Sequence, residues 1–425
     1  MRSPTRLAVA ITVLVTGLTV GTATAATAPP PVYAKAETPP LFDDEAGGNA
    51  NADDPAIWYN SARPSASLVV GTAKEGGLQV YGLDGHLVQS LPAPAAPGPD
   101  AAPGRYNNVD LLPNVRFPDG RRSTVAVATD RGRDRLRLYR IDGSNPTTPL
   151  TDVTDASAPR AFAATEAEVD DQFTAYGLAT WHDPDSGASY ALVSQRNTSD
   201  IALFKITSTA GGTLTYHKVR TLRLPSAFDT PGGRWSPCED PGEGPHIEGI
   251  VVDPDHGVAY LGQEDVGVWK VDADLDDEPE LVDRTKQFGI PATYDPVTEE
   301  CVAGEDPGYG GKHLTADTEG LTLFRAPSGD QYLIVSSQGD NTYSVYDTSD
   351  DDEWEASFRL APGSTVDGSE ETDGIAALSA PLGSAFPGGL FVAQDGHNAP
   401  ADGDRENTNY KFVDLRQILD AADLD

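Results

Sequence analysis

The feature of this sequence that most constrains its fold is a unit that recurs six times. In each unit an acidic or polar residue leads a short apolar strand, and a second apolar strand ends in a charged or amide-bearing residue. The first strands begin near Asp54, Asn108, Tyr176, Glu248, Glu319 and Asp373, and the second strands span residues 67–74, 124–131, 190–196, 258–264, 332–338 and 389–395. Because strand direction reverses at each connection, the start of the first strand and the end of the second lie at one edge. We therefore expect these polar side chains to share one face of the fold.

A third strand carrying an aromatic residue follows each pair, and less regular fourth strands appear around residues 86–91, 218–224, 281–287 and 354–360. Four strands per unit, at intervals of roughly 50 to 70 residues, are typical of a β-propeller. The sequence thus predicts an all-β fold, a six-bladed β-propeller covering residues 51–425, preceded by an N-terminal arm at 26–50. The one continuous helical pattern covers Leu415 to Ala422.

Residues 1–25 have the pattern of a secretory signal peptide. Arg2 and Arg6 precede an apolar stretch at 7–20, and Ala23 and Ala25 make a small-residue cleavage site. No later segment has the roughly 20 apolar residues that a spanning helix needs. We expect a secreted, extracellular, soluble protein. In that compartment the two cysteines, Cys238 and Cys301, are expected to form a disulfide, with two unpaired thiols as the alternative.

The formal net charge of -36 argues against nucleic acid and anionic membranes as partners and favours bound cations. The first strands of a propeller crowd round its axis, where a carboxylate costs several kcal/mol unless it is paired or bound to a cation. Oxygen ligands without a His or Cys cluster suit Ca²⁺. His246 and His313 lie near the acidic motifs, and we favour packing or support over a ligand or acid role for them. The alternate acids at Asp272, Asp274 and Asp276 are interpreted as a solvated turn.

Three basic residues, Lys74, Arg131 and Arg196, end the second strands of three consecutive units. This position predicts a mouth that is basic on one half and acidic on the other. A polyphosphate fits that division, because its oxygens can bridge cations and also accept charge-assisted hydrogen bonds. The alternative is that the three side chains are ordinary solvated turn residues.

At these same residues the sequence closely resembles the β-propeller phytases, the calcium-dependent alkaline phytases of bacteria. The matching stretches are Asp53 to Trp58, Asn107 to Asp110, Ile247 to Gly249, Glu264-Asp265, His313 to Leu321, Ser336 to Gly339, Glu371 to Ile375 and Leu390 to Gly396. They occur in the family's order and span Asp53 to about Ile418, which is nearly the whole chain after the signal peptide.

The resemblance implies an enzyme of the 3-phytase type, a phosphoric monoester hydrolase that removes phosphate from phytate (myo-inositol hexakisphosphate) with several Ca²⁺ ions. It implies phytate and other inositol phosphates as partners, bound as calcium complexes, and we expect a monomer. Carried over by motif, the metal ligands would be Asp53, Asp54, Asn108, Glu248, Glu264, Asp317, Glu319, Gln338, Asp367 and Asp373. The catalytic and phosphate-binding residues would be Lys74, Arg131, Tyr176, Arg196, Glu248 and Glu319.

The sequence departs from the better known members of that family in four ways. Arg196 replaces a lysine and keeps its charge, Asn197 replaces an acid, and Gln263 stands where another acid is common. The segment that holds Cys238 and Cys301 is also longer. Metal affinity and pH range are therefore expected to differ from the family's norm.

For the reaction we expect a metal-activated water to attack phosphorus while the three basic side chains neutralise the growing charge, with Glu248 or Glu319 orienting the water. Two other functions remain open from the sequence. One is a calcium-dependent propeller lactonase or esterase, which needs little positive charge near the metal. The other is a non-catalytic binding propeller, since a fold alone does not establish activity.

Overall fold

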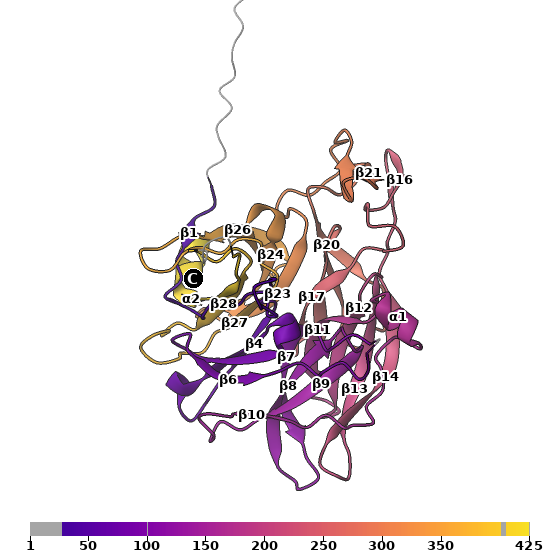
Figure 1. Cartoon of the computed structure of the whole chain (residues 1–425). Helices are drawn as coiled ribbons and strands as arrows, with labels where there is room; N and C mark the ends of the chain where they lie inside the picture. The colour runs from indigo at the N-terminus through magenta and orange to yellow at the C-terminus, as the bar shows by residue number, and fades with distance from the viewer. Residues whose placement is uncertain (1–27, 100, 401–404, 425) are drawn as a thin grey trace, which may run out of the picture.

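The computed structural model describes residues 28–99, 101–400 and 405–424, and the signal peptide expected at 1–25 lies outside them. Six small sheets are arranged as the blades of a β-propeller, which confirms the predicted fold (Figure 1). The four main strands of each blade pair antiparallel with their neighbours. The innermost strands contact one another in a closed ring, in the order β3, β7, β11, β17, β23 and β27 and back to β3.

The first three blades each contain four strands in sequence order. Blade 1 comprises β3 (Pro55–Trp58), β4 (Leu68–Thr72), β5 (Leu78–Gly82) and β6 (Leu87–Leu91). Blade 2 comprises β7 (Tyr106–Arg116), β8 (Arg122–Asp130), β9 (Arg135–Ile141) and β10 (Leu150–Asp152). Blade 3 comprises β11 (Ala175–His182), β12 (Ser189–Gln195), β13 (Asp200–Ser208) and β14 (Leu214–Arg223).

The last three blades follow the same plan with additions from the N-terminal segment. Blade 4 comprises β17 (Ile247–Asp253), β18 (Val258–Gln263), β19 (Gly267–Asp272) and β20 (Glu280–Arg284). Blade 5 comprises β23 (Thr318–Arg325), β24 (Gln331–Ser337), β25 (Thr342–Asp347) and β26 (Glu353–Leu360), with β1 (Pro31–Val32) as a fifth strand. Blade 6 comprises β27 (Ile375–Leu378), β28 (Leu390–Asp395), β29 (Asn409–Asp414) and, as its fourth strand, β2 (Ala36–Glu37).

The N-terminal segment therefore fastens the end of the chain. β2 pairs antiparallel with β29, and β1 pairs in parallel with β26. The helix expected over Leu415 to Ala422 is confirmed as α2 (Leu415–Ala422), which packs against β26 and β1 and buries Ile418 and Leu419. Asp414 caps its first turn by accepting a hydrogen bond from the backbone N–H of Arg416. A second helix, α1 (Glu166–Asp170), has a capping box and was not predicted.

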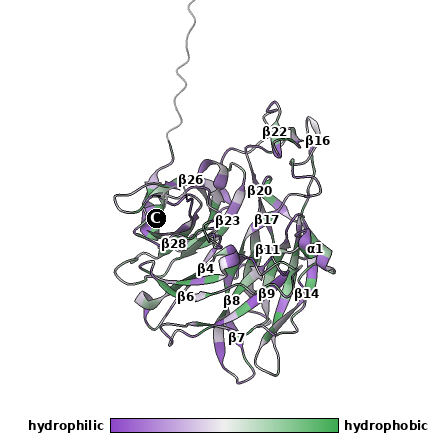
Figure 2. Cartoon of the chain, viewed as in Figure 1, coloured by the Kyte–Doolittle hydropathy of each residue, from purple (hydrophilic) through white to green (hydrophobic). Residues whose placement is uncertain are grey.

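The blades pack face to face through their apolar residues. Along β9 the side chains alternate between Arg and Leu, and the leucines Leu136 and Leu138 are fully buried in a cluster that reaches blade 3. Figure 2 shows this alternation of hydrophobic and hydrophilic positions along strands such as β9 and β14. Burying each leucine contributes about 1.5–3 kcal/mol.

Two glycines allow the inner strands to approach closely near the mouth of the channel. A Cβ on Gly177 would lie 2.1 Å from the carbonyl oxygen of Glu248, and a Cβ on Gly249 would lie 2.1 Å from that of Glu319. Each glycine thus makes room for the backbone of the acid that begins the next inner strand. The inner strands can then bring their leading residues close together.

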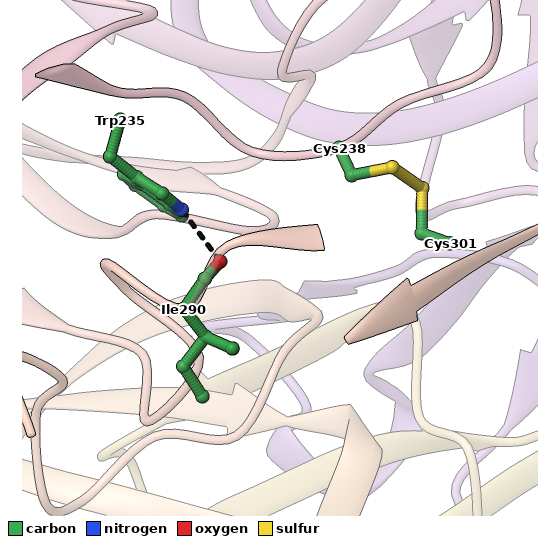
Figure 3. The surroundings of a disulfide bond; sticks show 4 residues. All are labelled: Trp235, Cys238, Ile290 and Cys301. Atoms are coloured by element: carbon green, nitrogen blue, oxygen red, sulfur yellow. Dashed lines mark hydrogen bonds between the residues drawn. A yellow bond between two sulfur atoms is a disulfide. The ribbon is translucent and has the colours of Figure 1, made fainter. Parts of the chain in front are cut away.

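Two segments outside the blade pattern project beside blade 4, one before it in the chain and one after it. The first contains the short hairpin of β15 (Phe228–Thr230) with β16 (Gly233–Trp235), and the second contains that of β21 (Ala292–Asp295) with β22 (Glu300–Ala303). A disulfide joins Cys238 to Cys301 with a Cα–Cα distance of 6.0 Å, as expected for the pair. The indole of Trp235 donates a hydrogen bond of 2.8 Å to the carbonyl oxygen of Ile290, which ties the same two parts together (Figure 3).

Three short 3₁₀ segments complete the described elements, namely η1 (Pro64–Ala66), η2 (Lys74–Gly76) and η3 (Gln338–Asp340). Among the described residues, the structure contains no helix with the length and apolar character needed to cross a membrane.

Candidate active site at the mouth of the channel

Three buried carboxylates meet at the mouth of the central channel. Glu248 and Glu319 are each the second residue of an inner strand, β17 and β23, and Glu264 directly follows β18. One oxygen from each lies within 4.8 Å of the others. Glu248 is 6% exposed and Glu319 is 5% exposed. The expected convergence of acids from separate blades is therefore present in the structure.

The close approach of these like charges needs a compensating charge. Burial raises the pKa of Glu248, Glu264 and Glu319 well above the ordinary value, and the neighbouring carboxylates raise it further. Oε1 of Glu264 and Oε2 of Glu319 are buried and have no hydrogen-bond partner among the described residues. Buried, unpartnered carboxylate oxygens at this spacing suit a hard divalent cation, so the residues present fit Ca²⁺.

Lys74 joins the acids of blades 1 and 6. Its Nζ lies 3.7 Å from Oδ2 of Asp53 and 3.6 Å from Oδ2 of Asp373. The charge of Asp53 is the main cause that raises the pKa of Lys74, so the ammonium stays charged. Burial raises the pKa of Asp373 to about 7, although Lys74 opposes that shift. Gln338 also contacts Asp373, since its Nε2 donates a hydrogen bond of 2.8 Å to Oδ1.

A chain of hydrogen bonds holds Glu248 from the side of blades 2 and 3. The hydroxyl of Tyr176 donates to Oε2 of Glu248, and Nδ2 of Asn107 donates to Oε1 at 2.7 Å. Nη1 of Arg131 donates to Oδ1 of Asn107 at 3.0 Å, and its guanidinium lies over the Tyr176 ring, 5.5 Å from the centroid. Burial raises the pKa of Tyr176 well above 10, so the phenol remains a donor. Both oxygens of Glu248 are thus fixed in place.

Arg196 occupies the third basic position of the mouth. Its Nη1 donates a hydrogen bond of 2.6 Å to Oδ1 of Asn197 and lies 3.7 Å from Oε1 of Glu243. His246 lies between two acids, with Nδ1 3.4 Å from Oε2 of Glu264 and Nε2 3.5 Å from Oε2 of Glu243. Burial, supported by the charge of Arg196, lowers the pKa of His246 to about 4. The imidazole is therefore neutral near neutral pH.

Two of the sequence departures have a structural reason. Asn197 has a φ of 63°, in the left-handed region where Asn is among the better tolerated residues. Gln263 does not point into the mouth. It is buried inside the sheet, where Oε1 accepts from the indole of Trp269 at 2.9 Å and Nε2 donates to the hydroxyl of Ser199 at 2.9 Å.

Asp54 and Asn108 lie deeper, along a cavity of about 600 Å³ in the channel that all six inner strands line. Oδ2 of Asp54 accepts a hydrogen bond of 2.9 Å from the backbone N–H of Val109, and burial raises its pKa well above the ordinary value. Oδ1 of Asn108 accepts from Nδ2 of Asn107 at 2.9 Å. Asp317 lies nearer the mouth, and its charge raises the pKa of Glu264.

Comparison with known proteins agrees with this geometry. A family profile described as Phytase matches residues 4–232 and 243–425. The chain belongs to the phytase family. A 3-phytase of Bacillus subtilis (strain 168) is 33% identical over 392 residues, which cover 91% of this chain and 84% of the relative. The stretch 233–242, which the family profile leaves out, contains Cys238 and Glu239.

One predicted metal ligand of this phytase-family chain belongs to a different group of charges. Asp367 pairs with Nζ of Lys411, a lysine with no exposed side-chain surface. The same Nζ lies 2.6 Å from Oε2 of Glu37 and 3.1 Å from Oδ2 of Asp395. This network ties β2 to β28 and β29 of the last blade.

Several residues at the mouth of the channel were not among the predicted site residues. Asn107 stood in a matching stretch, and its place directly before Asn108 at the head of an inner strand was the available signal. His246 was expected to pack or to support the site, and it lies between Glu243 and Glu264. Glu243 and Glu239 lie in the longer segment, where no repeat or spacing marks them.

Proposed function

We propose that the chain is a secreted, calcium-dependent phosphomonoesterase that hydrolyses phytate to lower inositol phosphates and inorganic phosphate. The observation that carries the proposal is a single mouth in which Glu248, Glu264 and Glu319 converge beside Lys74 and Arg131. Membership of the phytase family and the similarity to a 3-phytase support the choice of substrate. The signal-like residues 1–25 support secretion.

The basic side chains bind the substrate's phosphate groups. Lys74, Arg131 and Arg196 each stand at the end of a second strand, so they present cationic groups along blades 1 to 3. Phosphate oxygens accept charge-assisted hydrogen bonds from such groups, and a guanidinium can donate two in parallel. Arg131 donates to Asn107 and to Gln172, at 2.8 Å, so its guanidinium is oriented before any ligand arrives. A neutral ester or lactone would gain little from these cations.

The acidic side chains would hold the cations. Glu248, Glu264 and Glu319 form the central set, and Asp53, Asp317, Gln338 and Asp373 surround it. When bound, Ca²⁺ neutralises charge on phosphate oxygens and acidifies water.

The chain's own residues position the reaction. Tyr176 and Asn107 occupy both oxygens of Glu248, so this carboxylate keeps one orientation. Glu319 has an unpartnered Oε2 and is the residue proposed to orient the attacking water and accept its proton. Lys74 and Arg131 stabilise the negative charge that grows on the transferred phosphoryl group.

The test is phosphate release from phytate by the purified protein with Ca²⁺ and after addition of a chelator. We expect release with Ca²⁺ and its loss in the chelator. Arg131→Ala should lower turnover about 100-fold or more, the usual cost of removing a donor from a site of developing charge. Arg121→Ala is the matched control, because that arginine is 83% exposed. Equal release by wild type and Arg131→Ala would remove Arg131 from the mechanism, and hydrolysis of a lactone in place of phytate would support the other enzyme class.

A further inference from the structure

The segment between blades 3 and 4, which contains β15 and β16, reaches the acidic side of the mouth. Cys238 is bonded to Cys301 of the β21–β22 hairpin, and Glu239 is the next residue along the chain. The family profile leaves out residues 233–242, so Glu239 belongs to a part of the chain that the profile does not describe. The disulfide and the hydrogen bond from Trp235 to Ile290 fix the position of this stretch (Figure 3).

The carboxyl group of Glu239 lies among acids. It is within hydrogen-bonding reach of the Asp265 carboxyl, and its other strong charge interactions are with Glu264 and Asp317. Among the described residues, no lysine or arginine makes an ion pair with Glu239 or with Asp265. Four carboxylates are therefore gathered with no described lysine or arginine in an ion pair with any of them. The basic groups that act on them are His246, whose Nδ1 lies 3.4 Å from Oε2 of Glu264, and Arg196, whose charge lowers the pKa of Glu264.

Several buried oxygens of these acids have no described hydrogen-bond partner. Oε1 of Glu239 and Oε1 of Glu264 both have less than 1 Å² exposed and no hydrogen-bond partner among the described residues. Glu319, which is 5% exposed, also leaves Oε2 unpartnered, and it lies within 4.8 Å of Glu264. Buried charge of one sign is costly unless a counter-charge is bound, and a hard divalent cation accepts six to eight oxygens in flexible geometry.

We propose that Glu239 and Asp265, with Asp317, hold an additional Ca²⁺ beside the three central glutamates. Glu264 lies between the two sets and can share its oxygens with both. The inserted segment then contributes a cation position to the mouth, and Glu243 from the same segment supplies a carboxylate to Arg196 where Asn197 has none. This inference rests on the proposed calcium-dependent function.

The test compares Glu239→Gln with Glu300→Gln. Glu300 is an exposed residue of β22 that precedes Cys301, so it matches Glu239 in its place beside the disulfide. Calcium-free wild type and both variants are titrated with CaCl₂ by calorimetry, and their melting temperatures are measured with chelator and with Ca²⁺. We expect Glu239→Gln to bind one Ca²⁺ fewer, or to bind it at least about tenfold more weakly, while Glu300→Gln matches wild type.

The melting temperatures give a second readout. In Ca²⁺, the melting temperature of Glu239→Gln should rise less above its value in the chelator than that of wild type does, because one ligand of the additional ion is gone. Asp265→Asn should lose the same ion, which guards against an effect peculiar to one variant. The proposal is overturned if both variants bind as many Ca²⁺ ions as wild type and show the same calcium-induced shift in melting temperature. A proton shared between Glu239 and Asp265 would then account for the two buried carboxyl groups. Phosphate release from phytate by wild type in Ca²⁺ shows separately whether the proposed function holds.

Discussion

Removing divalent cations should make the stability of the protein fall as pH rises from about 6.5 to about 8.5. Burial raises the pKa of Asp373 and Asp265 to about 7 and that of Glu239 to about 9. A carboxyl whose pKa is higher in the folded than in the unfolded chain binds more protons when folded. Its stabilising effect is full at low pH and is lost as pH rises through the folded pKa.

The size of the loss follows from proton linkage. Between about pH 6.5 and about pH 8.5, a carboxyl with a pKa of about 7 loses somewhat under about 1 kcal/mol and one with a pKa of about 9 loses about 2–3 kcal/mol. For the three groups this amounts to roughly 4 kcal/mol. An unfolding entropy of about 2.1 cal/mol/K per residue gives about 0.9 kcal/mol/K for 425 residues, so the melting temperature should fall by about 5 °C.

Groups shifted in the other direction contribute little in this window. Burial lowers the pKa of His246 to about 4, and its unfolded value is near 6.5, so most of its effect lies below the window and the remainder raises stability by well under about 1 kcal/mol. Hydrogen bonds from Arg416 and Lys35 outweigh desolvation and lower the pKa of Asp414 to about 2, and this group titrates lower still.

The assay is thermal unfolding of the chelated protein across this pH range, repeated with Ca²⁺. Cations compete with protons for the same oxygens, so Ca²⁺ should reverse the trend and stabilise more at the higher pH. In the chelator, the melting temperature of Asp373→Asn should decrease less with pH than that of wild type. Asp185→Asn, at an exposed turn, should show the same pH dependence as wild type. A chelated protein whose melting temperature is flat or rises with pH would refute this reasoning.

Three further predictions follow from the contacts. Lys74→Met should lower turnover on phytate about 100-fold or more, measured beside a circular dichroism spectrum that matches wild type. Lys411→Met should lower the free energy of unfolding by about 3–5 kcal/mol in chemical denaturation. The substitution removes a fully buried ammonium group and leaves Glu37 and Asp395 without their ion-pair partner. Replacing Cys238 and Cys301 by Ser should cost about 4 kcal/mol in the same assay, the loop entropy for a separation of 63 residues. A cost below about 1 kcal/mol in either stability test would contradict the corresponding contact.

The repeat allowed the fold to be predicted because it marks where inner strands begin. The expected strands at 248–252 and 319–323 correspond to β17 and β23, and their leading glutamates meet as expected. Alternation along a strand fixes which side chains face the core, and that pattern is local in sequence. The fourth strands of blades 2 and 6 were missed because β10 and β2 have only three and two residues.

The partners of the site residues could not be predicted in this way. Nothing in the sequence places Asp367 against Lys411, since that contact joins β29 to a loop 44 residues earlier and depends on how the last blade closes. Glu239 and Glu243 reach the mouth through a disulfide and a loop without regular period. Such placements depend on tertiary geometry and not on the strand pattern.

The division of the mouth into basic and acidic halves has one geometric origin. A second strand that ends in a basic residue places it beside the leading residue of the neighbouring inner strands, as Lys74 lies between Asp53 and Asp373. Where the second strand is followed by an acid, as β18 is by Glu264, the same geometry gathers carboxylates that could hold a cation. Under the proposed function, a residue just after the second strand would therefore make blade 1 a source of a phosphate ligand and blade 4 a source of a metal ligand, whereas Asp395 at the end of β28 pairs with Lys411. Exchanging Arg196 for Glu would therefore be expected to convert blade 3 from one role to the other, with weaker phytate binding and stronger Ca²⁺ binding as the paired result.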